Sequence, residues 1–301
     1  MMQVGTDTPE HSYNRHRVGY IFVLPALVMY IIFFLYPFLS SIYLSLTDWD
    51  GINPMNYIGL ENYQRLLGDP QMWNALGHNI TWVLVGTFAP IAIGLLLAVL
   101  LWSNTRGQLV FRTVYFMPVV MSSVVVGIIW GWVYNPIFGF LNHLLEAVGL
   151  GGLARGWLGE TNTALYAVMV AAIWQYVGFC VVILFAGLQK VDIELIEAAR
   201  IDGANSWQRF INVIIPQLRH VLTMVTAYTV IGGFNVFDIV FILTKGGPAN
   251  ATELIATYTY KKSFQENDVG YGAALSMVMT ILALVATIIF MRIRSRGEEL
   301  E

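Results

Sequence analysis

The stretch "EAARIDGANSWQRFINVIIP" (residues 197–216) is a polar interruption between two long apolar segments, residues 164–188 and 221–243. It contains two carboxylates and two arginines, and ionised side chains are costly at the centre of a bilayer. The stretch is therefore expected to lie in water, with the apolar segments on either side crossing a membrane. This arrangement predicts two helical spans joined outside the lipid.

The composition of the chain is that of a membrane protein. Of its 301 residues, 57% are hydrophobic and 12% are charged, whereas soluble domains carry roughly 25% charged residues. The single cysteine, Cys180, excludes a disulfide framework and a cysteine-based metal site. The histidines are scattered without metal-ligand spacing, so we expect no metal site in this chain.

Six apolar segments approach or exceed the ~20 residues that a helix needs to cross a bilayer. Asp238 is the one formally charged side chain within them, which is typical of lipid-embedded helices. The predicted fold class is an all-α polytopic membrane protein with six transmembrane helices, the first retained because it is too long for a signal peptide. The segments are Val18–Leu46, Ile80–Trp102, Val114–Val133, Ala164–Leu188, Val221–Leu243 and Ala273–Met291.

The lysines and arginines predict the orientation of these spans. With the N-terminus inside, eleven basic residues fall in inner segments and five in outer loops, which accounts for all 16. This bias places both termini in the cytoplasm by the positive-inside rule, together with the loop at residues 189–217. The expected outer loops lie near residues 47–78, 136–162 and 245–270. The inner basic residues are Arg15, Arg17, Arg106, Arg112, Lys190, Arg200, Arg209, Arg219, Arg292, Arg294 and Arg296.

The 189–217 loop should begin with a short helix. Asp192 can cap its first turn, and Glu194 puts negative charge where the helix dipole favours it. Four residues then follow at i, i+3, i+4 and i+7, which places them on one face. Two of the four are alanines, so little side chain separates this backbone from a partner. The stripe consists of Leu195, Ala198, Ala199 and Asp202.

The second half of the loop carries a stop signal and a new start. Gly203 is suited to a left-handed C-cap, so the first helix should end there. Asn205 and Gln208 resemble a capping box, which predicts that a second helix begins at once. Pro216 disfavours helical geometry at Ile215 and suits the first turn of the next span. The loop is therefore expected to be a bent pair of short helices.

A surface connector whose charges merely face water would also fit this local pattern, because capping signals are common between helices. However, the stretch resembles the EAA signature of inner-membrane subunits of binding-protein-dependent ABC importers, written as EAA, three residues, Gly, nine residues, Ile, any residue, Leu, Pro. The spacing matches throughout, with Val213 at the Ile position and Ile215 at the Leu position. The matching residues are Glu197, Ala198, Ala199, Gly203 and Pro216.

The resemblance extends over nearly the whole chain and points to the sugar and glycerol-phosphate class of these permeases. The "GLENY" loop and the "TKGGP" turn resemble the first-named half of maltose and lactose systems. The stretches that carry the resemblance are "YIGLENYQRLLGDPQMWNAL" (57–76), "FRTVYFMPVVMSSVVVGIIW" (111–130), "IWQYVGFCVVILFAGLQKVDIELIEAARIDGA" (173–204) and "LTKGGPANATEL" (243–254).

The resemblance implies the type I ABC importer permease fold with both termini inside. The expected organisation is a cytoplasmic tail at residues 1–17, a six-helix permease domain at 18–291 that includes the 189–217 coupling loop, and a cytoplasmic tail at 292–301. The implied location is a bacterial or archaeal cytoplasmic (inner) membrane. The solute stays open among a disaccharide, an oligosaccharide, a polyol and glycerol phosphate.

No GxxxxGK[ST] stretch occurs, so the chain has no P-loop to hold nucleotide phosphates. The resemblance implies that a cytoplasmic ABC ATPase dimer uses ATP and Mg, while this chain binds no cofactor. The other implied partners are a second homologous permease subunit, an extracytoplasmic solute-binding protein and membrane lipid, with no nucleic acid. The EAA segment would be the coupling helix seated in a cleft of the ATPase. Its coupling residues would be Glu197, Ala198, Ala199, Asp202 and Gly203.

The fifth apolar segment carries polar residues at membrane depth. "YTVIGGFNVFDIVFILT" (228–244) places Asn235 and Asp238 three residues apart, and such groups usually face protein or a water-filled path. Its aromatic rings could stack on a sugar. Alternatively, Asp238 anchors the outer end of the helix and the glycine pair only packs. The residues assigned to the solute path are Tyr228, Gly232, Gly233, Asn235 and Asp238.

Two other function classes fit a polytopic membrane protein. An ion-coupled secondary transporter normally displays several intramembrane ionisable groups, and one Asp near a helix end is poor support for it. An intramembrane enzyme needs a nucleophile with a base, or a metal cluster, and the apolar segments hold neither a His nor a second carboxylate. The residues therefore favour a transport subunit that is not an enzyme.

Overall fold

The computed structural model describes residues 20, 22–102 and 107–298. These ranges are helical and contain no β-structure beyond one isolated bridge, between Thr47 and Tyr57. The chain divides into two compact units, one made of the residues up to Leu67 with Lys262–Met277, the other of Gly68–Lys261 with the chain from Val278 onward.

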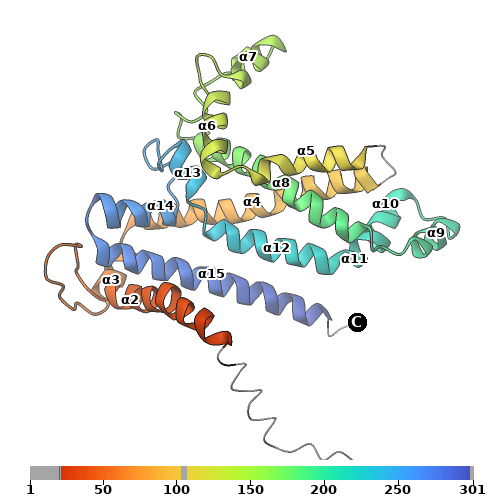
Figure 1. Cartoon of the computed structure of the whole chain (residues 1–301). Coiled ribbons are helices and arrows are strands. Elements are labelled where there is room, and N and C mark those ends of the chain that lie inside the picture. Colours follow the sequence, from red (N-terminus) through yellow and green to blue (C-terminus); the bar gives the residue numbers. More distant parts are fainter. Residues whose placement is uncertain (1–19, 21, 103–106, 299–301) are drawn as a thin grey trace, which may run out of the picture. The chain divides into compact units, whose positions relative to one another are not determined.

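Figure 1 labels the α-helices, and among the described residues four short helices of other types (η) lie between or beside them. Their bounds are η1 Ile31–Leu35, α2 Tyr36–Leu44, α3 Glu61–Leu67, α4 Pro70–Trp102, α5 Gln108–Val120, α6 Ser123–Val133, α7 Phe140–Ala147, η2 Gly151–Leu153, α8 Ala164–Leu188, α9 Ile193–Ile201, α10 Ser206–Arg209, η3 Phe210–Ile214, α11 Ile215–Gln217, α12 Arg219–Phe234, α13 Asp238–Leu243, α14 Ile255–Tyr260, η4 Lys261–Gln265 and α15 Val269–Glu298.

The first unit contains the N-terminal membrane helix and the segment after it. This helix runs from Phe22 to Leu44, and the predicted start of the span at Val18 lies outside the described residues. The buried Asn62 of α3 donates hydrogen bonds from Nδ2 to the carbonyls of Ser45 (3.0 Å) and Thr47 (2.8 Å). Because these carbonyls follow the last turn of α2, the amide fixes α3 beside the end of that helix.

Within the described residues, four helices are long and apolar enough to cross a membrane alone, and two bent helix pairs bring the number to six if each pair is one span. α4 begins at Pro70 rather than at the predicted Ile80, because proline suits the first turn of a helix. α15 likewise extends beyond the predicted Ala273–Met291 at both ends. All six predicted segments are helical, but the third and the fifth are not continuous.

The third predicted span, Val114–Val133, is broken in the middle. α5 ends at Val120, α6 begins at Ser123, and the two helices are bent by 99°. Met121 between them is extended, with φ −71° and ψ 142°, and its carbonyl accepts a hydrogen bond from Gln175 Nε2 at 3.0 Å. A backbone group freed inside a membrane needs an internal partner, so this contact from α8 stabilises the break.

The fifth predicted span, Val221–Leu243, is also not one helix. α12 ends at Phe234, residues 235–237 are not helical, and α13 begins at Asp238. Asn235 has φ −93° and ψ 9°, and its Nδ2 donates to the carbonyl four residues earlier at 3.1 Å. Hydropathy reports composition rather than backbone geometry, so it could not reveal this break.

The second unit is built around α8. This helix packs against α4 and α5, and α12 packs against α4, as Figure 1 shows. A Cβ added at Gly94 would lie 2.6 Å from Cβ of Cys180, and one at Gly178 would collide with the carbonyl of Tyr115. Small residues of this kind let membrane helices approach closely. Two apolar clusters fill the interfaces, one around Leu184 and one around Val168.

Candidate functional site

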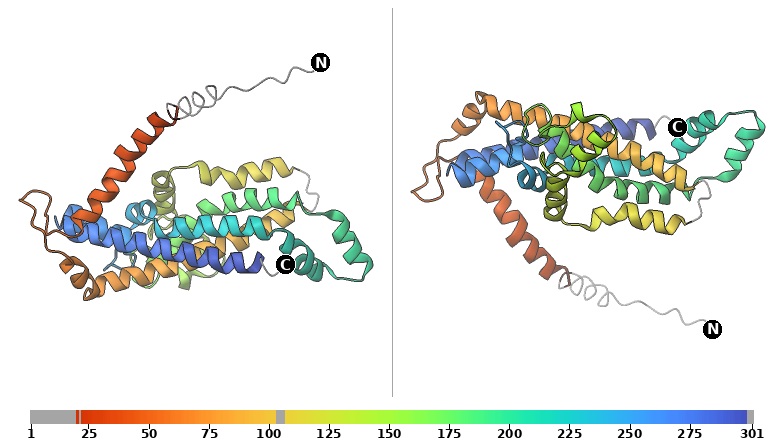
Figure 2. Two further views of the ribbon diagram at one scale, coloured as in Figure 1. Left: turned by 90° about the horizontal axis from the view of Figure 1, so that it is seen from below. Right: turned by 90° about the horizontal axis from the view of Figure 1, so that it is seen from above.

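The 189–217 loop folds as the bent helical pair that its sequence predicts. Figure 2 shows α9 and α10 projecting from one end of α8 and α12. Asp192 is the N-cap of α9, and its Oδ1 accepts a hydrogen bond from the backbone N–H of Glu194 at 2.9 Å. This bond satisfies one of the free N–H groups at the helix start, so the predicted cap of α9 is confirmed.

Gly203 ends α9 in the left-handed conformation, with φ +84°. The backbone N–H of Ala204 donates to the carbonyl of Ala199 at 2.9 Å, and that of Gly203 donates to the carbonyl of Arg200 at 3.2 Å. This pair of bonds is a Schellman motif, which satisfies carbonyls at the helix end. The predicted left-handed C-cap is therefore confirmed, and it sets the angle at which α9 leaves the loop.

α10 begins at Ser206 and carries the predicted capping box, with Asn205 as its N-cap. Asn205 Oδ1 accepts from the backbone N–H of Gln208 at 2.9 Å, and Gln208 Oε1 accepts from that of Asn205 at 2.8 Å. The expectation for Ile215 was wrong, since this residue is helical (φ −58°, ψ −45°) although Pro216 follows it. The preceding turn, Phe210–Ile214, is a π-helix, and its wider hydrogen-bonding pattern accommodates the missing N–H of the proline.

The face predicted for docking is open to solvent. Glu197, Ala198 and Asp202 are exposed, and Ala199 is half-buried against the rest of the loop. Large apolar side chains that the sequence reasoning did not select surround this stripe. Ile193, Ile201 and Trp207 are 60%, 86% and 70% exposed, and Leu195 of the predicted stripe is exposed as well. The available sequence signal was the gathering of large apolar residues in a polar loop that cannot enter lipid, because an exposed apolar patch is typical of an interaction surface.

The base of the loop is attached to the helices that it connects. The backbone N–H of Asp192 donates to Gln217 Oε1 at 2.9 Å, which joins the first residue of the loop helix to the last residue of α11. Val191, Ile214 and Leu218 are buried in the apolar cluster that also contains Leu184 of α8. The base of the loop is therefore joined to α8 and α12 by a hydrogen bond and by packed side chains.

A cavity of about 360 Å³ lies beside the break between α12 and α13, with α4, α6 and α8 contributing to its wall. All five residues assigned to the solute path from the sequence line it. The lining residues that were not assigned to the solute path from the sequence include Trp82, Ser123, Gln175 and Tyr176. Gln175 and Tyr176 are adjacent polar residues in the apolar segment 164–188, and this was the sequence signal that could have identified them.

The glycine pair in α12 has two different roles. A Cβ at Gly233 would lie 3.1 Å from Val83 Cγ2 and 3.3 Å from Val83 Cα, so this residue permits α12 to pack on α4. A Cβ at Gly232 would meet no heavy atom within 4 Å, although Gly232 lines the cavity. Gly233 therefore fits the packing interpretation, and Gly232 leaves open space beside Asn235.

The "TKGGP" turn covers a buried carboxyl group outside the apolar segments. Glu253 is 2% exposed, and its Oε1 accepts a hydrogen bond from Thr257 Oγ1 at 2.5 Å. A Cβ at Gly246 would lie 2.7 Å from Glu253 Oε2, so the glycine admits the carboxyl group beneath the turn. Burial raises the pKa of Glu253 above its ordinary value, although Thr257, Lys261 and His78 act in the opposite direction.

The chain is similar to known transport proteins along most of its length. Residues 90–296 match the family described as "Binding-protein-dependent transport system inner membrane component". A probable ABC transporter permease protein of Pyrococcus horikoshii is 35% identical, with 93% of this chain and 96% of that protein covered. The trehalose/maltose transport system permease protein MalF of Thermococcus litoralis is 30% identical, with 95% and 96% covered.

A solved structure shares the fold. One chain of a bacterial ABC transporter involved in the import of the acidic polysaccharide alginate superposes with a TM-score of 0.82 at 20% sequence identity, with 95% of this chain and 98% of that chain covered. The importer permease fold predicted from the sequence is therefore confirmed. The matched family consists of inner-membrane transport components, which decides against an intramembrane enzyme and gives no support to an ion-coupled carrier.

Proposed function

Because this chain belongs to the family of binding-protein-dependent transport system inner membrane components, we propose that it forms half of the path by which an ATP-driven importer moves a carbohydrate or related solute. Similar permease proteins are named for starch degradation products and for trehalose and maltose, which supports a carbohydrate. An extracytoplasmic binding protein would deliver the solute to this path. The chain is a transport subunit of the cytoplasmic membrane and not an enzyme.

The observation that carries this proposal is a polar wall at membrane depth that the chain leaves uncovered. Tyr228, Asn235 and Asp238 line the cavity, and all three are exposed. Polar side chains within a span usually face protein or a water-filled path, because exposure to lipid is costly. A second homologous permease subunit would close the open side of the cavity and keep lipid away from these groups.

The side chains around the cavity suit a sugar. Tyr176 and Tyr228, which are 46% and 54% exposed, offer aromatic faces for the C–H surface of a pyranose ring. Asn235 adds an exposed amide that can donate to and accept from hydroxyl groups, whereas the buried Gln175 amide donates to the carbonyl of Met121. A mainly apolar pocket with a few polar groups is typical of small-molecule sites.

The 189–217 loop would be the contact with the ATPase. Its predicted coupling residues combine two small side chains, Ala198 and Ala199, with the exposed carboxylate of Glu197, which suits close approach to a cleft that carries a basic group. In this mechanism ATP and Mg act in the partner ATPase, whose closure pulls α9. The Gln217 contact and the cluster around Leu184 then transmit the movement to α8 and α12, which line the cavity.

The test is uptake by vesicles that contain this chain with its partner permease and ATPase. We expect uptake to require both ATP inside and the loaded binding protein outside, and the binding protein to stimulate ATP hydrolysis. Asn235→Leu should reduce uptake while it leaves assembly unchanged, because it removes a polar group from the cavity. Uptake driven by an ion gradient without ATP would overturn the proposal.

A further inference from the structure

The cavity beside α13 has an unbalanced charge. Among the described residues that line it, Asp238 is the one acidic side chain, and there is no lysine, arginine or histidine. The remaining polar groups are neutral hydroxyls and amides. The part of the path that this chain contributes is therefore acidic in character, and it offers no cation to a bound solute.

Asp238 is not committed to another contact. It is the first residue of α13, it is exposed, and no described residue forms a hydrogen bond or ion pair with its carboxylate. The phenol of Tyr176 lies close enough to this carboxylate to interact with it electrostatically, and Tyr228 lines the same cavity. A carboxylate is an acceptor, so these oxygens are free to receive hydroxyl protons from a solute.

An anionic solute would meet a different environment in the same place. Two like charges in a site of low dielectric repel each other, and a buried anion without a cation or enough hydrogen-bond donors is strongly disfavoured. A neutral polyhydroxylated solute has neither problem, because each hydroxyl can donate to the carboxylate. We propose that Asp238 is a charge filter, which makes this path accept neutral polyhydroxylated solutes and exclude phosphate esters and uronates. This inference rests on the proposed function, since it assumes that the cavity belongs to the solute path.

The charge of the cavity can be measured without knowing the solute. The purified complex of this chain with its partners, carrying Cys180→Ala and Gly232→Cys, would react with neutral, sulfonate and ammonium methanethiosulfonate reagents. The new thiol at position 232 has open space in front of it. 2-Mercaptoethanol provides the intrinsic rate ratios of the three reagents. A second reporter, Thr229→Cys, lines the same cavity and replaces the first if that variant does not assemble.

We expect the sulfonate reagent to react about tenfold more slowly than the neutral one, after correction for intrinsic rates, and the ammonium reagent to react faster. Asp238→Asn keeps the shape of the side chain and should return both ratios to the intrinsic values. Intrinsic ratios with Asp238 present would overturn the inference, as would a slow sulfonate reaction that persists in Asp238→Asn. The proposed function is tested separately, by ATP-dependent uptake in vesicles that contain the complex without the cysteine substitutions. Absence of this uptake would refute the proposed function, whatever the reaction rates of the three reagents.

Discussion

Gly203→Ala tests the coupling loop through its backbone alone. Gly203 has φ +84°, and a Cβ added there would meet no heavy atom within 4 Å. The substitution therefore removes no contact and creates no clash, but an L residue in the left-handed region costs roughly 1–2 kcal/mol. If docking on the ATPase requires the Schellman motif, that strain opposes docking and should weaken the affinity by about 5- to 30-fold.

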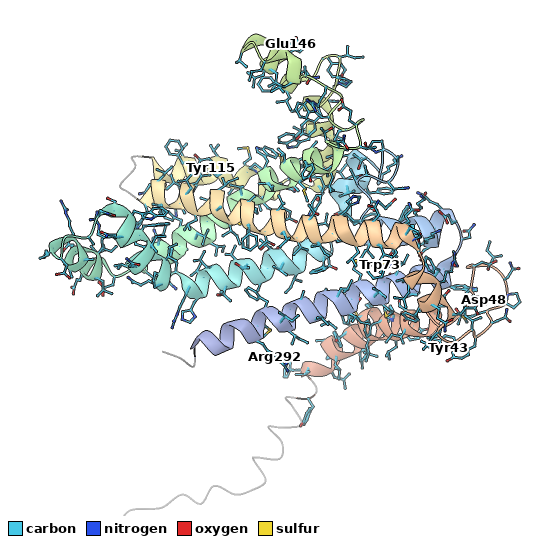
Figure 3. The ribbon with its side chains drawn as sticks, turned by 180° about the vertical axis from the view of Figure 1, so that it is seen from behind. Tyr43, Asp48, Trp73, Tyr115, Glu146 and Arg292 are labelled. Atoms are coloured by element: carbon cyan, nitrogen blue, oxygen red, sulfur yellow. The ribbon has the colours of Figure 1, made fainter. Side chains whose placement is uncertain are left out.

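Gly149 offers a matched control at the end of α7. It has φ +80° with open space around it, and Leu150 N–H donates to the carbonyl of Leu145 at 2.7 Å in the same Schellman arrangement. Gly149→Ala should therefore carry a similar conformational penalty. Figure 3 labels Glu146 on α7, at the tip of a protrusion away from α9 and α10, so this control perturbs a cap far from the loop.

The assay is a titration of the purified ATPase onto each permease complex in nanodiscs, together with ATP hydrolysis stimulated by the binding protein. We expect Gly203→Ala to raise the dissociation constant by about 5- to 30-fold and to reduce stimulation, while Gly149→Ala retains the values of the unmodified complex. Equal effects of the two substitutions would refute the reasoning, because the geometry at the end of α9 would then have no special role. Thermal unfolding of both variants measures general instability independently of ATPase binding.

Three further predictions follow from single contacts. Glu197→Ala should reduce co-purification of the ATPase in a graded way because it removes an exposed carboxylate without changing the backbone, and full retention would contradict that role. Gly233→Ala should lower the melting temperature, because overpacking against Val83 costs about 1–3 kcal/mol. Gly232→Ala should reduce uptake without lowering the melting temperature, because its Cβ meets no atom and points into the open space of the cavity. The reverse pattern would contradict the roles assigned to the two glycines. Because the pKa of Glu253 is raised, its contribution to stability is largest below the ordinary pKa and is lost as the pH rises through the raised pKa. Glu253→Gln should therefore flatten the dependence of the melting temperature on pH between these two pKa values, and an unchanged slope there would refute this.

Much of the site could be predicted because its signals are local. The Asp192 cap, the Asn205 capping box and the Gly203 C-cap each depend on backbone groups within five residues, so side-chain chemistry and φ preference are enough to place them. The helical character of the six apolar segments is determined in the same way, because a membrane span must satisfy its backbone hydrogen bonds internally. The sequence also identified Asn235 and Asp238 in the fifth segment, because the free-energy cost of a polar side chain in lipid depends on its type and can be judged without a structure.

The shape of the cavity required the tertiary structure. The break at Met121 depends on Gln175, 54 positions away in the chain, and no local pattern reveals that an α8 amide satisfies an α5 carbonyl. The same holds for the glycine pair, in which one residue packs on Val83 and its neighbour opens toward the cavity, because helix rotation relative to α4 assigns these roles. The sequence by itself determined which segments enter the membrane, where the loop helices start and stop, and which polar groups need an explanation. Only the tertiary structure decided where two spans break and which groups meet around the cavity, because those outcomes depend on contacts between helices that are far apart in the sequence.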